Sequence, residues 1–239
     1  MKLLLQAPIY TSSGYGEHSR LVLRSLLNLQ SDELDIYLQP LNWGRTSWSN
    51  QDYNLNRMAL NLQKKNEIYV KNSNNKPEYD IQIQVGIPNE FVKCAPYSVC
   101  VTAGIESDKI SAEWVLKTHQ GIDKVIVPSE HSKLGFSNTT YDARDDKGNE
   151  FKISCKSPVE VVPYPVKEIQ PKQVDLELST KFNFLCVAMF GPRKNIENTV
   201  EWFLQEFKDN EDVGLVLKVS RGRSCILDRE NTTQTLQEI

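Results

Sequence analysis

The sequence lacks several patterns that mark whole classes of protein. Its five cysteines are an odd number and include no CxxC pair, which argues against a disulfide scaffold and against a zinc ribbon. Its apolar runs are too short to span a bilayer, and the start, MKLLLQAPIY, is too short for the core of a signal peptide. We therefore expect a cytoplasmic protein with no transmembrane segment.

An excess of positive charge is also missing. Lys and Arg number 28 against 31 Asp and Glu, a formal net charge of −3, so we expect no nucleic-acid partner. The chain is 39% hydrophobic and 9% aromatic, which is too apolar for a disordered protein. These values predict a globular protein, and 239 residues suffice for one or two domains.

The common catalytic signatures are absent as well. The sequence contains no Asp-x-Asp pair, no GxSxG elbow and no GxxxxGK[ST] loop. His18, His119 and His131 are too scattered to predict a metal cluster. We expect neither a metal ion nor a bound cofactor.

What the sequence does contain is an α/β pattern. Lys2–Ala7 predicts a strand, two glycines follow, apolar residues recur at helical spacing from Glu17, and Leu34–Leu38 predicts a second strand. A strand, a glycine turn, a helix and a strand open an α/β unit with a parallel sheet. Further along we expect a loop at Leu41–Asn56, strands at Tyr79–Val85, Tyr97–Thr102, Lys124–Val127 and Val159–Val162, helices at Ser111–His119 and from Ser129 to Phe136, and a hairpin within Ser137–Lys156.

The same pattern starts again near Phe182. Phe182–Phe190 predicts a strand, Asn195 could cap a helix, and Val213–Val219 predicts another strand. The polar segment before it predicts a linker. We expect two Rossmann-like units, the second incomplete, with domains at 1–167 and 181–239 and a linker at 168–180.

The first candidate site is the glycine pair Gly14 and Gly16 with Tyr15 between them. Glycines between a strand and a helix let the backbone approach a phosphate at the helix N-terminus. The dinucleotide fingerprint needs a third glycine, where Ser19 stands, and an acidic residue where the strand ends in Gln39. A nicotinamide-dependent oxidoreductase is therefore disfavoured, and a plain tight turn remains an alternative.

Two further candidates carry charge. Arg193 and Lys194 directly precede a predicted helix, where two cations could bind a pyrophosphate; the alternative is a solvated basic turn. Glu106 follows a predicted buried strand, and carboxyl ends of strands face the ligand crevice in open α/β sheets. Its carboxylate could bind sugar hydroxyls or transfer a proton, and the alternative is a surface loop residue.

Four stretches carry a family resemblance: 12–16 (SSGYG), 101–108 (VTAGIESD) with 113–115 (EWV), 122–130 (IDKVIVPSE), and 184–195 with 212–218. Together they resemble the retaining nucleotide-sugar glycosyltransferases of GT-B fold, the "glycosyl transferases group 1" family. That family has two Rossmann-like domains facing across a cleft. The N-terminal domain takes the acceptor and the C-terminal domain takes the nucleotide sugar.

The resemblance implies a function and a set of site residues. The reaction would move a hexose from a nucleotide-diphosphate sugar, the co-substrate, to a hydroxyl of an acceptor such as a saccharide, with retention and without metal. Gly14, Tyr15, Gly16 and Glu106 would bind substrate, with Glu106 also catalytic. Lys194 matches the family's diphosphate-binding Lys and would face the glycine pair, and Arg193 would replace a family Arg whose place Met189 occupies.

The family's acidic pair, two Glu separated by seven residues, is missing. We therefore expect a fragment of a longer gene or a truncated relative, with poor sugar transfer by this chain alone. The alternative function is a non-catalytic sugar- or nucleotide-binding module.

Overall fold

A computed structural model describes residues 1–29, 31, 33–44, 46–49, 52–166, 168–223 and 225–239. The chain divides into two compact units. The N-terminal unit comprises Met1–Trp43 and Trp48–Val166, and the C-terminal unit comprises Lys167–Ile239 with Gly44–Ser47. Residue 167, where the first predicted domain ends, lies outside the described residues.

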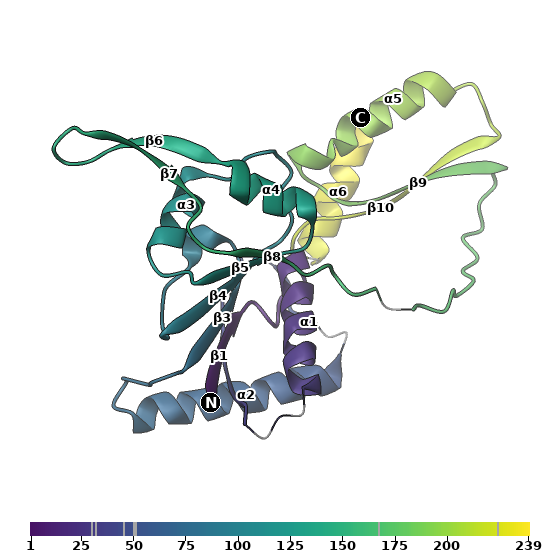
Figure 1. Cartoon of the computed structure of the whole chain (residues 1–239). Coiled ribbons are helices and arrows are strands. Elements are labelled where there is room, and N and C mark those ends of the chain that lie inside the picture. Colours follow the sequence, from purple (N-terminus) through teal and green to yellow (C-terminus); the bar gives the residue numbers. More distant parts are fainter. Residues whose placement is uncertain (30, 32, 45, 50–51, 167, 224) are drawn as a thin grey trace. The chain divides into compact units, whose positions relative to one another are not determined.

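The N-terminal unit is built on a six-stranded parallel sheet (Figure 1). The strand order is β2-β1-β3-β4-β5-β8. The predicted α/β fold with a parallel sheet is therefore confirmed for this unit. The strands are β1 (Lys2–Ala7), β2 (Asp35–Pro40), β3 (Ile81–Val85), β4 (Tyr97–Val101), β5 (Lys124–Val127) and β8 (Val159–Val161).

Helices cover both faces of this sheet. Leu23 of α1 (Gly14–Asn28) packs on the face of β1 that carries Leu3 and Leu5. On the opposite face, α3 (Ala112–His119) and α4 (Glu130–Asn138) pack on β5 through Val115 and Phe136. This is the doubly wound arrangement of Rossmann-like folds.

Two predicted boundaries were wrong. The first helix begins at Gly14 rather than Glu17, because the Ser13 side chain caps it by accepting from the Gly16 N–H. The predicted loop Leu41–Asn56 contains the start of a 20-residue helix, α2 (Tyr53–Asn72), which Asp52 caps by accepting from the Leu55 N–H.

Two other predictions were confirmed. An antiparallel hairpin of β6 (Thr140–Arg144) and β7 (Glu150–Ser154) lies within the segment expected to form one. Ser129 caps α4 as expected, its hydroxyl accepting from the Ser132 N–H.

The C-terminal unit has a two-stranded parallel sheet of β9 (Phe182–Met189) and β10 (Val213–Ser220). It also contains the 3-10 turn η2 (Pro192–Lys194), α5 (Ile196–Phe207) and α6 (Ile226–Glu238). The rings of Phe184, Phe203 and Phe207 contact one another between β9 and α5. The predicted strand, turn, helix and strand are therefore present here too.

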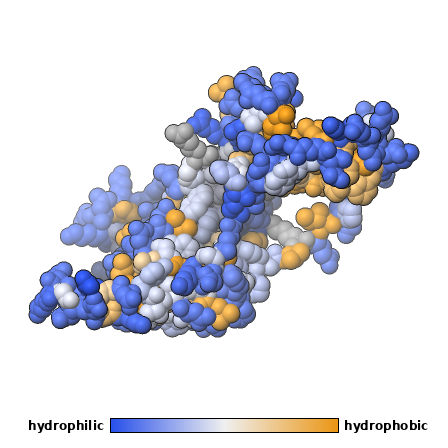
Figure 2. All heavy atoms as spheres, turned by 90° about the horizontal axis from the view of Figure 1, so that it is seen from above, coloured by the Kyte–Doolittle hydropathy of each residue, from blue (hydrophilic) through white to orange (hydrophobic). Residues whose placement is uncertain are grey.

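Apolar side chains of the C-terminal unit remain exposed. Figure 2 shows hydrophobic surface over the right-hand part of the view, where this unit lies in Figure 1. On β9, Leu185 is 67% exposed and Val187 is 62% exposed. Interior strands of a parallel sheet are usually covered on both faces, so this sheet is only partly covered within the unit itself.

Candidate functional site

The order of the strands defines a switch point in the N-terminal unit. The chain passes from β1 to β2 in one direction and from β3 to β4 in the other. The loops after β1 and β3 therefore diverge, and ligands of open α/β sheets bind in the crevice at that point. The segments that follow these strands are Pro8–Ser13 and Gly86–Ile87.

Tyr15 joins two of the predicted stretches at this edge. Its Oη lies 3.0 Å from the Thr102 Oγ1 and accepts from the Ala103 N–H at 3.2 Å. Burial raises the pKa of Tyr15 above its ordinary value, while the hydrogen bonds to Thr102 and Ala103 act in the opposite direction. The first turn of α1 is thereby fixed to the carboxyl end of β4.

The two glycines of this turn differ in how much space surrounds them. A Cβ on Gly16 would lie 2.1 Å from the backbone O of Thr11, so only glycine fits there. A Cβ on Gly14 would meet nothing within 4 Å. Packing explains Gly16, whereas Gly14 leaves open space at the helix N-terminus, where a ligand could approach the backbone.

A buried arginine shapes the loop before the helix. Arg20 is 4% exposed, and its Nη1 donates to the backbone O of Ile9 and of Thr11. Its Nε donates to Glu17, which completes the ion pair. Because a buried guanidinium is costly without such partners, Arg20 fixes the turn that carries Gly14.

Aromatic side chains lie near the switch point, and apart from Tyr15 the sequence analysis did not assign them to the site. The rings of Trp43 and Tyr15 are 4.4 Å apart, and a Cβ on Gly86 would lie 3.8 Å from the Trp43 ring. The Tyr10 and Trp48 rings are stacked at 5.1 Å. The signal available in the sequence was a tryptophan three residues after the second strand.

Glu106 lies in the loop that follows β4, and its side chain is exposed. Two contacts tie the loop to α4: the Ile105 N–H donates to Ser132 Oγ, and His131 Nε2 lies 3.1 Å from the Ser107 backbone O. A Cβ on Gly104 would lie 3.7 Å from Pro128. The stretches 101–108 and 122–130 are therefore neighbours at this edge.

His18 was dismissed from the sequence, yet it lies near the same edge. Its ring meets that of Tyr164 edge-on at 4.8 Å, and its Nδ1 is buried without a hydrogen-bond partner among the described residues. Burial lowers the pKa of His18 and raises that of Tyr164, while a backbone hydrogen bond from Gly104 acts against the latter shift. Both side chains line a small apolar groove of about 240 Å³ beside α1.

Arg193 and Lys194 belong to the C-terminal unit, in the exposed turn η2 after β9. Asn195 is the N-cap residue of α5, as expected, but its side chain makes no capping hydrogen bond. Asn195 has a positive φ of 50°, and its Oδ1 accepts from the Asn198 side chain instead of a helix N–H. Its backbone O accepts from the Thr199 N–H as α5 begins.

A different cation lines the cavities at the carboxyl ends of β9 and β10. Arg221 lies between a cavity of about 330 Å³ next to α5 and one of about 470 Å³ next to α6. Its guanidinium sits 5.0 Å from the centre of the Phe190 ring and donates to Thr235 Oγ1. The sequence offered the signal of an arginine directly after a strand, one position beyond β10.

Two further properties bear on ligands and location. Within the described ranges, no three or more His, Cys, Asp or Glu side chains gather as ligands of a metal ion would. None of the helices described combines the length and apolar character needed to cross a membrane.

The fold defines a doubly wound α/β unit with a switch point between β1 and β3. The chain matches no protein-family model, and no curated protein sequence matches it.

Proposed function

We propose that the chain acts in glycosyl transfer, as a retaining, metal-independent hexosyltransferase of GT-B type. The N-terminal unit takes a hydroxyl-bearing acceptor such as a saccharide, and the C-terminal unit takes a nucleotide-diphosphate sugar. One observation carries the proposal. Tyr15, from the glycine stretch, is hydrogen-bonded to Thr102 and Ala103, from the stretch that contains Glu106, at the carboxyl edge of a parallel sheet.

In this proposal the acceptor meets aromatic and polar groups of the N-terminal unit. Trp43 offers an apolar ring surface against which the C–H face of a sugar packs. Glu106 accepts hydrogen bonds from acceptor hydroxyls and receives a proton during transfer. Gly14 leaves room for the substrate next to the N–H groups of α1.

The donor diphosphate meets cations of the C-terminal unit. Arg193 and Lys194 donate to its oxygens, and Arg221 is a third donor next to the same strand ends. These groups stabilise the charge that develops on the leaving diphosphate, which is the role a metal ion fills elsewhere.

A titration with UDP and with NADH tests the ligand class. We expect UDP to bind and NADH not to bind. Lys194→Ala should weaken UDP binding by about 1–3 kcal/mol, the scale of a charge-assisted hydrogen bond. Lys208→Ala, at the other end of α5, is the matched control and should leave UDP binding unchanged. Equal affinities in both variants and the parent would refute the donor site.

The alternative, a non-catalytic sugar- or nucleotide-binding module, is favoured by the exposure of Glu106. Acids that transfer protons are commonly desolvated, which tunes their pKa. Release of UDP from UDP-hexoses, with and without an added saccharide, separates the two. The enzyme hypothesis requires detectable UDP release, slow because the family's acidic pair is missing, and Glu106→Gln should abolish it. UDP-sugar binding without any release would support the module.

A further inference from the structure

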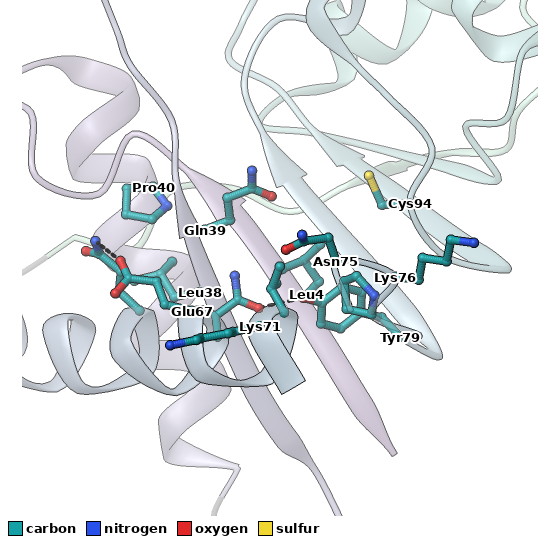
Figure 3. A pocket seen from close by; sticks show the side chains of 14 residues that line it. Leu4, Leu38, Gln39, Pro40, Glu67, Lys71, Asn75, Lys76, Tyr79 and Cys94 are labelled. Atoms are coloured by element: carbon teal, nitrogen blue, oxygen red, sulfur yellow. Dashed lines mark hydrogen bonds between the residues drawn. The ribbon is translucent and has the colours of Figure 1, made fainter. Parts of the chain in front are cut away.

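The largest cavity described in the N-terminal unit lies away from the residues proposed above. It is a cleft of about 710 Å³ between the second half of α2, the middle of β1 and the end of β2 (Figure 3). Its volume falls in the range of small-molecule sites, roughly 300–1,000 Å³. Leu4, Leu38 and Tyr79 are the buried apolar residues that line it.

Opposite α2, the cleft is bordered by the connection from β3 to β4 rather than by a second helix. The connection from β3 to β4 contains only the 3-10 turn η1 (Pro88–Glu90) and an irregular segment. That segment is held by buried glutamines: Gln84 donates to the Glu90 backbone O, and Gln82 donates to the Val92 backbone O. Both are satisfied through the backbone, so they can be buried at little cost.

A chain of amides leads from this segment to the wall of the cleft. The Cys94 N–H donates to Gln82 Oε1, so Gln82 Nε2 must face Gln6, and it donates to Gln6 Oε1 at 2.5 Å. Gln6 Nε2 then donates to Gln39 Oε1 at 2.8 Å. The Cys94 N–H thus fixes the orientation of each amide in this series of hydrogen bonds. As a result, the exposed Gln39 is left with its amide N–H groups as donors.

Two amides of α2 are oriented in the same way. Tyr79 Oη donates to Asn66 Oδ1 at 2.5 Å, which leaves the Asn66 NH₂ as a donor. Tyr10 Oη donates to Gln63 Oε1, while Gln63 Nε2 donates to Glu67 Oε1. The Glu67 carboxylate in the cleft therefore already accepts a hydrogen bond. The groups that the amides can still offer to a ligand are N–H donors.

Lys71 and Lys76 add two cations to the lining, and both are exposed. Figure 3 shows Gln39 and Cys94 on one side of the cleft and the α2 side chains, Lys71 among them, on the other. The lining therefore combines amide and ammonium donors with an apolar floor. Such a surface suits a compact molecule that is rich in oxygen acceptors, has an anionic group and presents an apolar C–H face.

We propose that this cleft binds an anionic monosaccharide, a hydroxylated ring that bears a carboxylate or a phosphate group. Gln39 and Asn66 donate to its hydroxyl and ring oxygens, and Lys71 or Lys76 neutralises the anionic group. This proposal for the cleft does not depend on the proposal that the chain acts in glycosyl transfer.

Alkylation of the Cys94 thiol measures whether a ligand occupies the cleft, because the thiol is exposed and lines the cleft. In the full chain, alkylation of Cys94 and of Cys225 is followed by peptide mass spectrometry. Cys225 is exposed in the C-terminal unit and serves as the internal control. Glucuronate or glucose 6-phosphate at ten times its Kd should slow Cys94 alkylation about tenfold and leave Cys225 unchanged.

Gln39→Glu tests the donor. The variant still offers an oxygen to Gln6, so the amide chain survives, but the outward donor becomes an acceptor. Protection by the anionic sugars should weaken at least about tenfold. Gln170→Glu adds the same charge to an exposed site of the C-terminal unit and should keep full protection.

Lys71→Gln and Lys76→Gln test the anion. At least one should abolish the preference for glucuronate over glucose, whereas Lys64→Gln, on the same helix but outside the lining, should not.

The assignment is overturned if no sugar protects Cys94 at up to about 10 mM. It is also overturned if glucose protects as well as glucuronate, if Cys225 is protected equally, or if Gln39→Glu retains full protection. Absence of UDP binding with Cys94 protection intact would refute the glycosyl-transfer proposal and leave the cleft assignment standing.

Discussion

The two units use the same succession of strand, turn, helix and strand, but they differ in how much apolar surface they bury. Among the described residues, Ile196 and Val200 are the buried apolar residues of the C-terminal unit, and all others belong to the N-terminal unit. Six parallel strands are covered by helices in one unit, whereas the other has a two-stranded sheet with exposed apolar side chains.

The difference shows that the local pattern does not by itself make a stable sheet. A parallel strand gains stability mainly from burial on both faces, and free energy of burial grows with the apolar area removed from water. Leu5 of β1 is fully buried, whereas Leu185 of β9 is 67% exposed. We therefore expect backbone amides of β9 and β10 to exchange with solvent faster than those of β1 and β4.

The largest effect should come from truncating the core of the N-terminal unit. Leu5→Ala removes a side chain that is 0% exposed and should cost about 3–5 kcal/mol through lost burial and the cavity left behind. Hydrogen exchange read peptide by peptide, together with urea unfolding, measures it in each unit. Leu185→Ala is the matched control and should stay within about 0.5 kcal/mol. Similar losses in both variants would contradict the comparison.

The sequence predicted most of the strands because each is a short apolar run that ends in a turn residue. Lys124–Val127, followed by Pro128, has the predicted bounds in the structure. The sequence analysis did not identify helix α2. Its inward positions Leu55, Ala59, Leu62 and Tyr69 recur at helical spacing, but the buried polar Asn66 interrupts them and the apolar Met58 and Ile68 are exposed, which obscures the pattern.

Only part of the candidate site could be predicted from the sequence. The glycine pair and Glu106 were found because loops after strands carry recognisable residue types. The glutamines Gln6, Gln82 and Gln39 were not found, because isolated amides in strands have no signature until the sheet aligns them. The pairing of Gln6 with both Gln39 and Gln84 in neighbouring strands follows from strand order, which only the folded sheet determines.

A smaller loss should follow removal of Gln82, the fully buried amide that links the Cys94 N–H to Gln6. Gln82→Leu keeps the approximate volume but leaves Gln6 Oε1 and the Cys94 N–H without partners. We expect destabilisation of the N-terminal unit by about 2–4 kcal/mol. Gln63→Leu, on the half-buried surface of α2, should cost less. Unfolding in urea measures both, and an unchanged midpoint for Gln82→Leu would refute the role of the amide chain.

Tyr15→Phe should have a smaller effect again. It removes the hydroxyl that accepts from the Ala103 N–H and bonds to Thr102, so we expect a loss of about 1–2 kcal/mol in the N-terminal unit. Tyr53→Phe alters a ring that is 77% exposed and should be neutral. If Tyr15→Phe weakened acceptor binding without any change in stability, Tyr15 would contact the ligand rather than fix the loop.

The smallest effect concerns the pH dependence of stability in the N-terminal unit. Burial lowers the pKa of His18, so the folded state favours the neutral ring, while the unfolded chain protonates near the ordinary value of about 6.5. As pH falls below that value, the unfolded state binds more protons, and stability declines until the folded pKa is passed. Protonation would also place a charge at Nδ1, which has no partner among the described residues. His18→Phe should therefore lose less stability than the parent between about pH 7 and pH 5, whereas His131→Gln, at an exposed position, should follow the parent. Parallel pH profiles of urea unfolding for His18→Phe and the parent would show that His18 is not held neutral by its surroundings.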